Sequence, residues 1–145
     1  MKLLIQRVDY ANICINNSEI REIKKGLLVY VGIKKEELDE NIEKAVKKLL
    51  KIGFFENEEG KLKKSIVDIQ GDILIVPNFS LYAKSKKGTT LSFDESANFE
   101  YANMIYDKFL SILKEKYSNI KTGEFRTQMD IVSKANGPVN VILEF

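Results

Sequence analysis

The sequence contains no histidine and no tryptophan, and only one cysteine and two prolines among its 145 residues. Without histidine there can be no Ser-His-Asp triad, no Cys-His pair and no imidazole general base. The single cysteine, Cys14, can form neither an internal disulfide nor a Cys-x-x-Cys site. The usual zinc sites are also excluded, and we predict no metal and no cofactor. An enzyme of this composition must rely on main-chain donors, hydroxyls, carboxylates, lysines or its own substrate.

Long apolar runs are also missing. No segment approaches the roughly 20 apolar residues that cross a bilayer, and the N-terminal segment 1–7 becomes polar too early for a signal peptide. We therefore expect a cytoplasmic protein with no membrane contact. The length suits one domain with a substantial core, and no repeat or low-complexity linker divides it. The prediction is a single domain that spans residues 1–145.

Charge is nearly balanced, with a net charge of +2, but the 23 basic residues include only three arginines, Arg7, Arg21 and Arg126. Lysine is a flexible point charge that suits phosphate contact better than bidentate reading of bases. A nucleic-acid partner would therefore be held mainly by its backbone. Lys84, Lys86 and Lys87 are the candidates for contact with such a backbone, although such a group also fits a solvated surface loop.

The hydrophobic pattern predicts strands clustered towards the two ends of the chain and two helices. Helical spacing of apolar residues predicts amphipathic helices over 36–51 and 98–117. A continuous apolar run over 26–33 predicts a strand buried on both faces. The other predicted strands or extended segments are 2–8, 10–15, 19–23, 72–76, 79–83, 121–125, 130–133 and 139–145. We predict an α+β domain with a largely antiparallel, barrel-like sheet of about seven or eight strands and two helices packed on it.

The segment 76–82 interrupts the sheet pattern. Pro77 cannot donate to a strand ladder, so the strand must bend or change its partner there. Backbone N–H groups freed at such a break can face a cleft and stabilise an oxyanion. We expect Asn78 and Ser80 on one side of an extended segment and Phe79 on the other. The alternative interpretation is an edge-strand kink with two solvated polar residues.

The segment 135–140 forms a second interruption. Gly137-Pro138 is a stiff dipeptide whose bond can be cis. A glycine in a rigid loop lets main-chain atoms approach a ligand closely, which suits steric discrimination. The alternative interpretation is an ordinary hairpin turn between two strands.

Taken together, these segments resemble the D-aminoacyl-tRNA deacylases. No single motif is decisive, but their order and spacing are specific and span Met1 to Phe145. The matching segments are Gln6-Arg7-Val8, 26–29, 55–57, 79–83, 87–88, 92–93, 122–125, Met129 and 137–139.

This resemblance implies a homodimer with an active site at each subunit interface. Such enzymes hydrolyse the ester that joins a D-amino acid, or glycine, to the 3′ end of tRNA. The family's Ser-Gln-Phe-Thr-Leu motif maps onto 77–81, which implies substrate contact by the main chain around Phe79 and puts Ser80 where a nucleophile has been suggested. Asn136, Gly137 and Pro138 map onto a cis Gly-Pro loop that enters the partner's site and excludes L side chains. Arg7 resembles the arginine that holds this loop, and Met129 is assigned to the pocket.

The chain departs from the family pattern at several positions, and two alternatives follow. Pro77, Asn78, Ser80, Ala135 and Asn140 stand where the family has serine, glutamine, threonine, asparagine and threonine. Loss of the asparagine at 135, together with Pro77 and Asn136, favours a related deacylase with relaxed chirality that acts on small L-aminoacyl-tRNAs. Loss of basic residues at 89–90 favours a catalytically silent, tRNA-binding homodimer.

Overall fold

The computed structural model describes residues 1–85 and 88–145, so the predicted tRNA contacts Lys86 and Lys87 lie outside the described residues. The main sheet has six strands in the order β10-β1-β3-β6-β9, with β2 paired to β1 as well. These strands are β1 (Lys2–Ile15), β2 (Glu19–Ile23), β3 (Gly26–Gly32), β6 (Asp72–Pro77), β9 (Ile120–Thr122) and β10 (Met129–Glu144). The pairings of β1 are antiparallel, whereas β3–β6 and β6–β9 are parallel.

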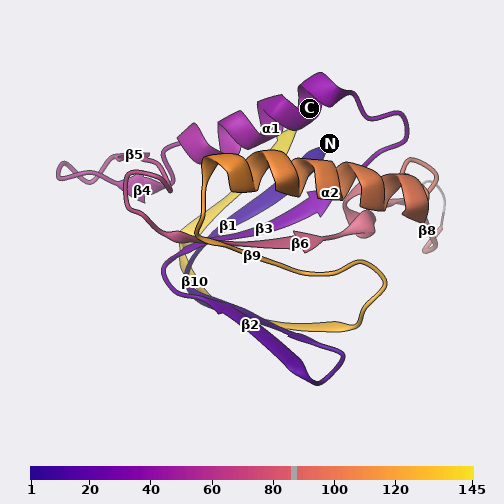
Figure 1. Cartoon of the computed structure of the whole chain (residues 1–145), viewed down its shortest axis with the longest axis horizontal. Coiled ribbons are helices and arrows are strands. Elements are labelled where there is room, and N and C mark those ends of the chain that lie inside the picture. Colours follow the sequence, from indigo (N-terminus) through magenta and orange to yellow (C-terminus); the bar gives the residue numbers. More distant parts are fainter. Residues whose placement is uncertain (86–87) are drawn as a thin grey trace.

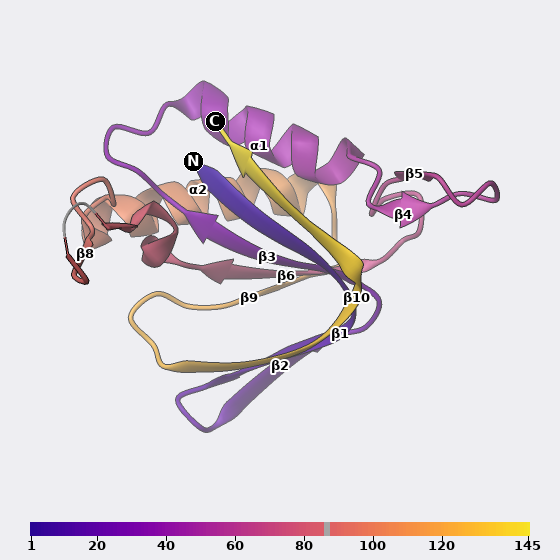
Figure 2. The same cartoon turned by 180° about the vertical axis from the view of Figure 1, so that it is seen from behind.

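Two helices cover one face of this sheet (Figure 1). They are α1 (Asp39–Lys51) and α2 (Phe99–Lys116), each with an apolar stripe buried against the strands. The far end of β1 curls away from the helices together with β2 and the start of β10 (Figure 2). The predicted α+β domain is confirmed, and its sheet is nearly closed into a barrel.

Small elements connect the larger ones. The two-stranded ribbons are β4 (Phe55–Glu56) with β5 (Leu62–Lys64), and β7 (Lys84–Ser85) with β8 (Leu91–Ser92). A 3-10 helix, η1 (Phe79–Tyr82), follows β6. The second ribbon and η1 lie at the end of the sheet where β3 and β6 terminate (Figure 1).

The core has two parts, one on each face of the central strands. Side chains of β3 and β6 such as Leu27 and Ile73 pack under the helices, whereas Leu28 and Leu74 pack against the curled part of β1. Strand β3 is thus buried on both faces, as its continuous apolar run predicted. Burial on both faces fixes the position of the end of β3 and β6, where the candidate site lies.

Three sequence-based expectations about local structure are wrong. The segment 79–83 is not extended, because Pro77 ends β6 and the Asn78 side chain caps η1 by accepting from Ser80 N–H at 3.0 Å. The segments 2–8 and 10–15 form one strand, and so do 130–133 and 139–145. The latter are joined because both halves of β10 pair with β1, with residues 136–139 forming a bulge opposite Arg7 instead of a hairpin turn.

Candidate active site

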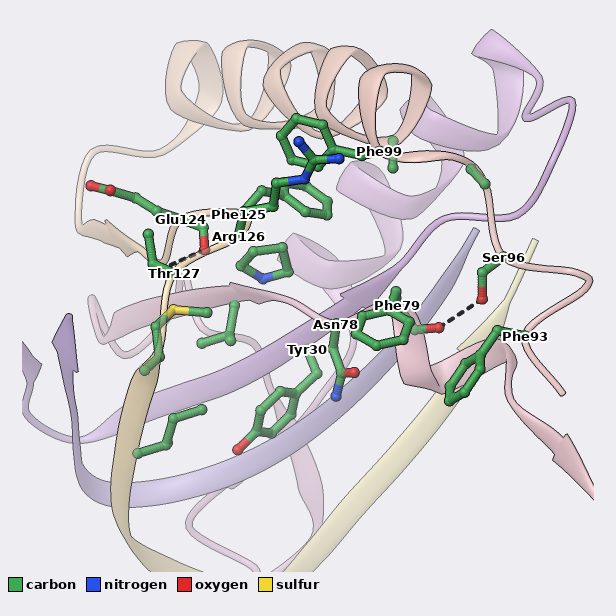
Figure 3. A pocket seen from close by; sticks show the side chains of 16 residues that line it. Tyr30, Asn78, Phe79, Phe93, Ser96, Phe99, Glu124, Phe125, Arg126 and Thr127 are labelled. Atoms are coloured by element: carbon green, nitrogen blue, oxygen red, sulfur yellow. Dashed lines mark hydrogen bonds between the residues drawn. The ribbon is translucent and has the colours of Figure 1, made fainter. Parts of the chain in front are cut away.

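A cavity of about 580 Å³ opens at the end of β3 and β6 (Figure 3). Its walls come from η1, the start of α2, the turn 124–127 and the first residues of β10. Most lining side chains are apolar or aromatic, and burial raises the pKa of the Tyr30 phenol above its usual value. Of the predicted site residues, Asn78, Phe79 and Met129 line this cavity. Ser80 does not belong to its lining.

Phe79 supplies a main-chain donor at the cavity wall. Its N–H donates to no acceptor within residues 1–85 and 88–145, whereas the neighbouring N–H groups of Asn78 and Ser80 are both satisfied. An unpaired N–H beside a cavity can stabilise negative charge on a substrate oxygen. The break at Pro77 therefore leaves the Phe79 N–H without an acceptor among the described residues, in a residue that lines the cavity.

The Ser80 hydroxyl is engaged elsewhere. Its Oγ–H donates to the Asn78 side-chain oxygen at 2.5 Å, and the residue is exposed. An amide oxygen is not a base that could take the hydroxyl proton during nucleophilic attack. The arrangement therefore fits a capping role for Ser80 better than a nucleophilic one.

Two contacts hold η1 against the sheet. Gly32 lies so close that a Cβ atom built there would be 2.8 Å from Leu81 Cβ, so a side chain would displace the turn. In addition, the buried Ser96 hydroxyl donates to the Phe79 carbonyl at 2.9 Å. Together these contacts fix the orientation of the peptide groups on either side of Phe79.

Aromatic side chains border the mouth of the cavity. Phe79 and Phe93 are 59% and 39% exposed, and their ring centroids are 5.1 Å apart. Exposed aromatic rings of this kind offer stacking surfaces to nucleobases. In Figure 3 they lie on one side of the cavity, and Phe99, Phe125 and Arg126 lie on the other.

Arg7, which the resemblance assigns to the support of the Gly-Pro loop, contacts the backbone of that loop. The buried guanidinium of Arg7 donates to the carbonyl oxygens of Asn136, at 3.1 Å, and of Phe54, at 3.0 Å. The Asn136 side chain in turn donates to Asp9 at 2.5 Å, and this bond, together with Lys134, holds the pKa of Asp9 below its usual value. The loop thus has side-chain support although position 135 is alanine.

The loop itself has a close-packed backbone. The Gly137-Pro138 peptide bond is cis, and Gly137 has a φ of 149°. A Cβ atom built on Gly137 would lie 2.2 Å from the Val139 nitrogen. Only glycine fits this position.

The loop does not reach the cavity of its own chain. Ile131 lines the cavity, and Gly137 lies six residues further along β10, roughly 15–20 Å away at the usual strand rise. Gly137 and Pro138 are not part of the cavity wall, and Arg7 and Asn136 line a separate, polar depression. A single chain therefore keeps the two predicted parts of the site apart.

Among the predicted lysine contacts, only Lys84 can be placed. It is exposed in β7 and forms an ion pair with Glu95. Its contact with tRNA remains a prediction.

Sequence reasoning missed Gly32, Phe93, Ser96, Phe99 and Arg126. Each of them lines the cavity or contacts η1 only because the fold brings distant segments of the chain together. Phe93 was quoted as part of the family pattern, but without a role. Arg126 offered a faint signal, as one of only three arginines in a lysine-rich chain.

Neither a metal-binding cluster nor a membrane-spanning helix is found in the described part of the chain. Within residues 1–85 and 88–145, no cluster of three or more His, Cys, Asp or Glu side chains could hold a metal ion. None of the described helices is both long and apolar enough to pass through a bilayer.

Comparison with known proteins gives whole-chain matches. The pattern of the family described as D-Tyr-tRNA(Tyr) deacylase matches residues 4–144. The D-aminoacyl-tRNA deacylase of Petrotoga mobilis is 39% identical over 145 residues, which cover 99% of this chain and 97% of that protein. The D-aminoacyl-tRNA deacylase of Aquifex aeolicus is 38% identical over 144 residues, with the same coverage.

Two solved structures share the fold. A c-Myc DNA unwinding element binding protein superposes with a TM-score of 0.93 and 34% identity, covering 100% of this chain and 99% of that one. A probable eukaryotic D-amino acid tRNA deacylase superposes with a TM-score of 0.85 at 20% identity, covering 98% of this chain and 97% of that one, a likeness of fold alone.

Proposed function

The chain belongs to the D-Tyr-tRNA(Tyr) deacylase family and is a hydrolase of the ester bond in D-aminoacyl-tRNA, and we propose that main-chain groups, not a side-chain nucleophile, carry out its reaction. The observation that carries this proposal is the unpaired N–H of Phe79 beside a cavity, in a chain without histidine. The location that we propose is the cytoplasm, where aminoacyl-tRNAs are made and used.

In the proposed reaction, the terminal adenosine and its aminoacyl group occupy the cavity. The Phe79 N–H donates to the ester carbonyl oxygen as negative charge develops on it. A water oxygen attacks the carbonyl carbon, and the bond to the ribose oxygen breaks. The water proton passes to that ribose oxygen with help from the neighbouring 2′-hydroxyl, so the products are free tRNA and the amino acid.

Chiral selection in this proposal requires a second copy of the chain. The cavity and Gly137-Pro138 are far apart within one chain. They come together if the loop of one subunit enters the cavity of its partner, as the family resemblance implies. Strand β10 suits an interface, because it is an edge strand of the sheet. It also exposes the apolar side chains of Val132 and Ile142, which are 58% and 67% accessible. Main-chain atoms of the loop would then collide with an L side chain but leave room for a D one.

The direct test compares tRNA charged with D-tyrosine, L-tyrosine, glycine and L-alanine. We expect rapid release of D-tyrosine and glycine, with L-tyrosyl-tRNA left intact. Rapid release of L-alanine would instead identify the deacylase with relaxed chirality, and no release from any substrate would identify a silent tRNA-binding protein.

Ser80→Ala should retain most of the hydrolytic activity, within about threefold of the wild type, because the hydroxyl only supplements the cap of η1. The measurement is kcat/KM on D-tyrosyl-tRNA. Asn78→Ala is the companion variant. It removes the acceptor of the Ser80 N–H, a cap of typically about 1 kcal/mol, and should lower activity more. A loss of several hundredfold in Ser80→Ala would assign the chemistry to the hydroxyl.

A further inference from the structure

Arg126 differs from the other two arginines in its contacts. The guanidinium of Arg7 binds two carbonyl oxygens, and that of Arg21 binds Glu19, Glu124 and the Thr122 carbonyl. The Arg126 guanidinium makes no hydrogen bond and no ion pair with any residue that the structure describes. Its carbon Cζ lies 3.8 Å from the centroid of the Phe99 ring.

This stacking platform is anchored in the core. Phe99 packs edge-on against Phe125 at 5.8 Å, and Phe125 packs edge-on against Tyr106 at 5.3 Å. The Tyr106 hydroxyl is buried and donates to the carbonyl oxygens of Ile75 and Gly123. The platform therefore presents the guanidinium in a defined place, unlike the flexible lysines elsewhere on the surface.

The backbone at Arg126 is also unusual. Its φ is 55°, a left-handed conformation that non-glycine residues adopt rarely and at an energetic cost. The adjacent turn is closed by the Thr127 hydroxyl, which donates to the Glu124 carbonyl at 2.9 Å. An arginine kept in this conformation at a cavity wall is a reason to look for a ligand.

The position of Arg126 indicates which ligand it can meet. Arg126 and Phe99 both line the cavity that Phe79 lines from the other side (Figure 3). Stacking uses the face of the guanidinium and leaves its N–H donors at the edge available for an anion. Among the described residues that line the cavity, Glu124 is the one acidic side chain, and Arg21 already binds it. A nucleic-acid strand that delivers its terminal nucleoside to this cavity brings phosphodiester groups to the cavity mouth.

We propose that Arg126, stacked on Phe99, binds a backbone phosphate of the single-stranded 3′ end of the substrate tRNA and so positions the terminal adenosine in the cavity. The guanidinium donates two parallel hydrogen bonds to the phosphate oxygens. This inference rests on the proposed function, because the phosphate is that of the aminoacyl-tRNA. Arg126 acts in binding and takes no part in the bond cleavage.

The decisive variant is Arg126→Gly. Glycine adopts the left-handed conformation readily, so this variant removes the cation without disturbing the turn and should unfold thermally at or above the wild-type temperature. With D-tyrosyl-tRNA, we expect kcat/KM to fall about tenfold to a hundredfold, mostly through KM. With 3′-O-D-tyrosyl-adenosine, which has no phosphate, we expect rates within twofold of the wild type. Arg126→Lys should recover only part of the loss, because lysine cannot bind bidentately.

Salt dependence supplies an independent readout. Loss of one phosphate contact to a single strand should reduce the slope of log affinity against log salt by about 0.7. Binding of uncharged tRNA measures this without any hydrolysis, so the inference can be tested even if the wild type proves inactive. Lys47→Ala, which removes an exposed cation on α1, is the matched control and should leave kcat/KM unchanged.

Two results would overturn the inference. Unchanged kcat/KM of Arg126→Gly on tRNA would show that no phosphate is bound there. An equal loss on tRNA and on the aminoacyl-adenosine would show that Arg126 contacts the nucleoside or the amino acid instead. Absence of hydrolysis by the wild type on every substrate would contradict the proposed function alone.

Discussion

Phe79→Pro is expected to lower kcat by about a hundredfold to a thousandfold, whereas Phe79→Ala should lose far less. Proline removes the one N–H that the proposed mechanism uses, and loss of a single oxyanion donor has this magnitude in other enzymes. Alanine keeps the N–H and removes only the exposed ring. The measurement is hydrolysis of D-tyrosyl-tRNA at saturating substrate by both variants.

The structure allows this substitution without general unfolding. Phe79 is the first residue of η1, a position where proline is tolerated. Asn78 is extended, with φ of −145° and ψ of 98°, and so avoids the helical region that is disfavoured before proline. Thermal unfolding within a few degrees of the wild type would confirm that the fold is intact. If a folded Phe79→Pro variant kept full activity, the main-chain mechanism would be wrong.

Gly137→Ala is expected to reduce discrimination between D- and L-tyrosyl-tRNA at least about tenfold, because a Cβ atom would lie 2.2 Å from the Val139 nitrogen and the loop must move. Rates on both substrates should be measured side by side. Gly60→Ala is the matched control, since Gly60 also has a positive φ, 72°, but no atom within 4 Å of the added Cβ. Unchanged discrimination by Gly137→Ala would remove the loop from the selective step.

A mixed dimer distinguishes a loop that acts in its own subunit from one that acts in the partner. One subunit carries Phe79→Pro and the other carries Gly137→Ala. If the loop enters the partner's cavity, one site combines an intact Phe79 amide with an intact loop, and the dimer regains wild-type selectivity at about half the wild-type rate. If the loop acts within its own chain, the active subunit also carries the altered loop, and selectivity stays low.

The architecture was largely predictable because the periodicity of apolar residues reports burial. The run 26–33 has no polar position and is buried on both faces in β3, and the stripes of both helices face the sheet as expected. The conformation at local breaks in this pattern was harder to predict. Pro77 signals the end of a ladder, but whether the chain then stays extended or turns depends on the Asn78 side chain, which caps η1.

The candidate site was only partly predictable for a different reason. Asn78 and Phe79 stand out because they follow a strand break, and Arg7 and Gly137 were assigned through the family resemblance. Ser96 and Arg126 join the site from distant segments, through a hydrogen bond to the Phe79 carbonyl and a stacking contact on Phe99. No local pattern encodes such contacts, so only the folded arrangement shows them.

A catalytic donor in the main chain is not specified by any single codon. In the proposed mechanism, every residue except proline supplies the same N–H at position 79, so few mutations can delete the donor directly. Inheritance must instead preserve the backbone path, which depends on the missing side chain at Gly32 and on the Ser96 hydroxyl. Side chains around position 79 can then be substituted without loss of the reaction. The evolutionary constraint falls instead on the packing contacts that fix the backbone.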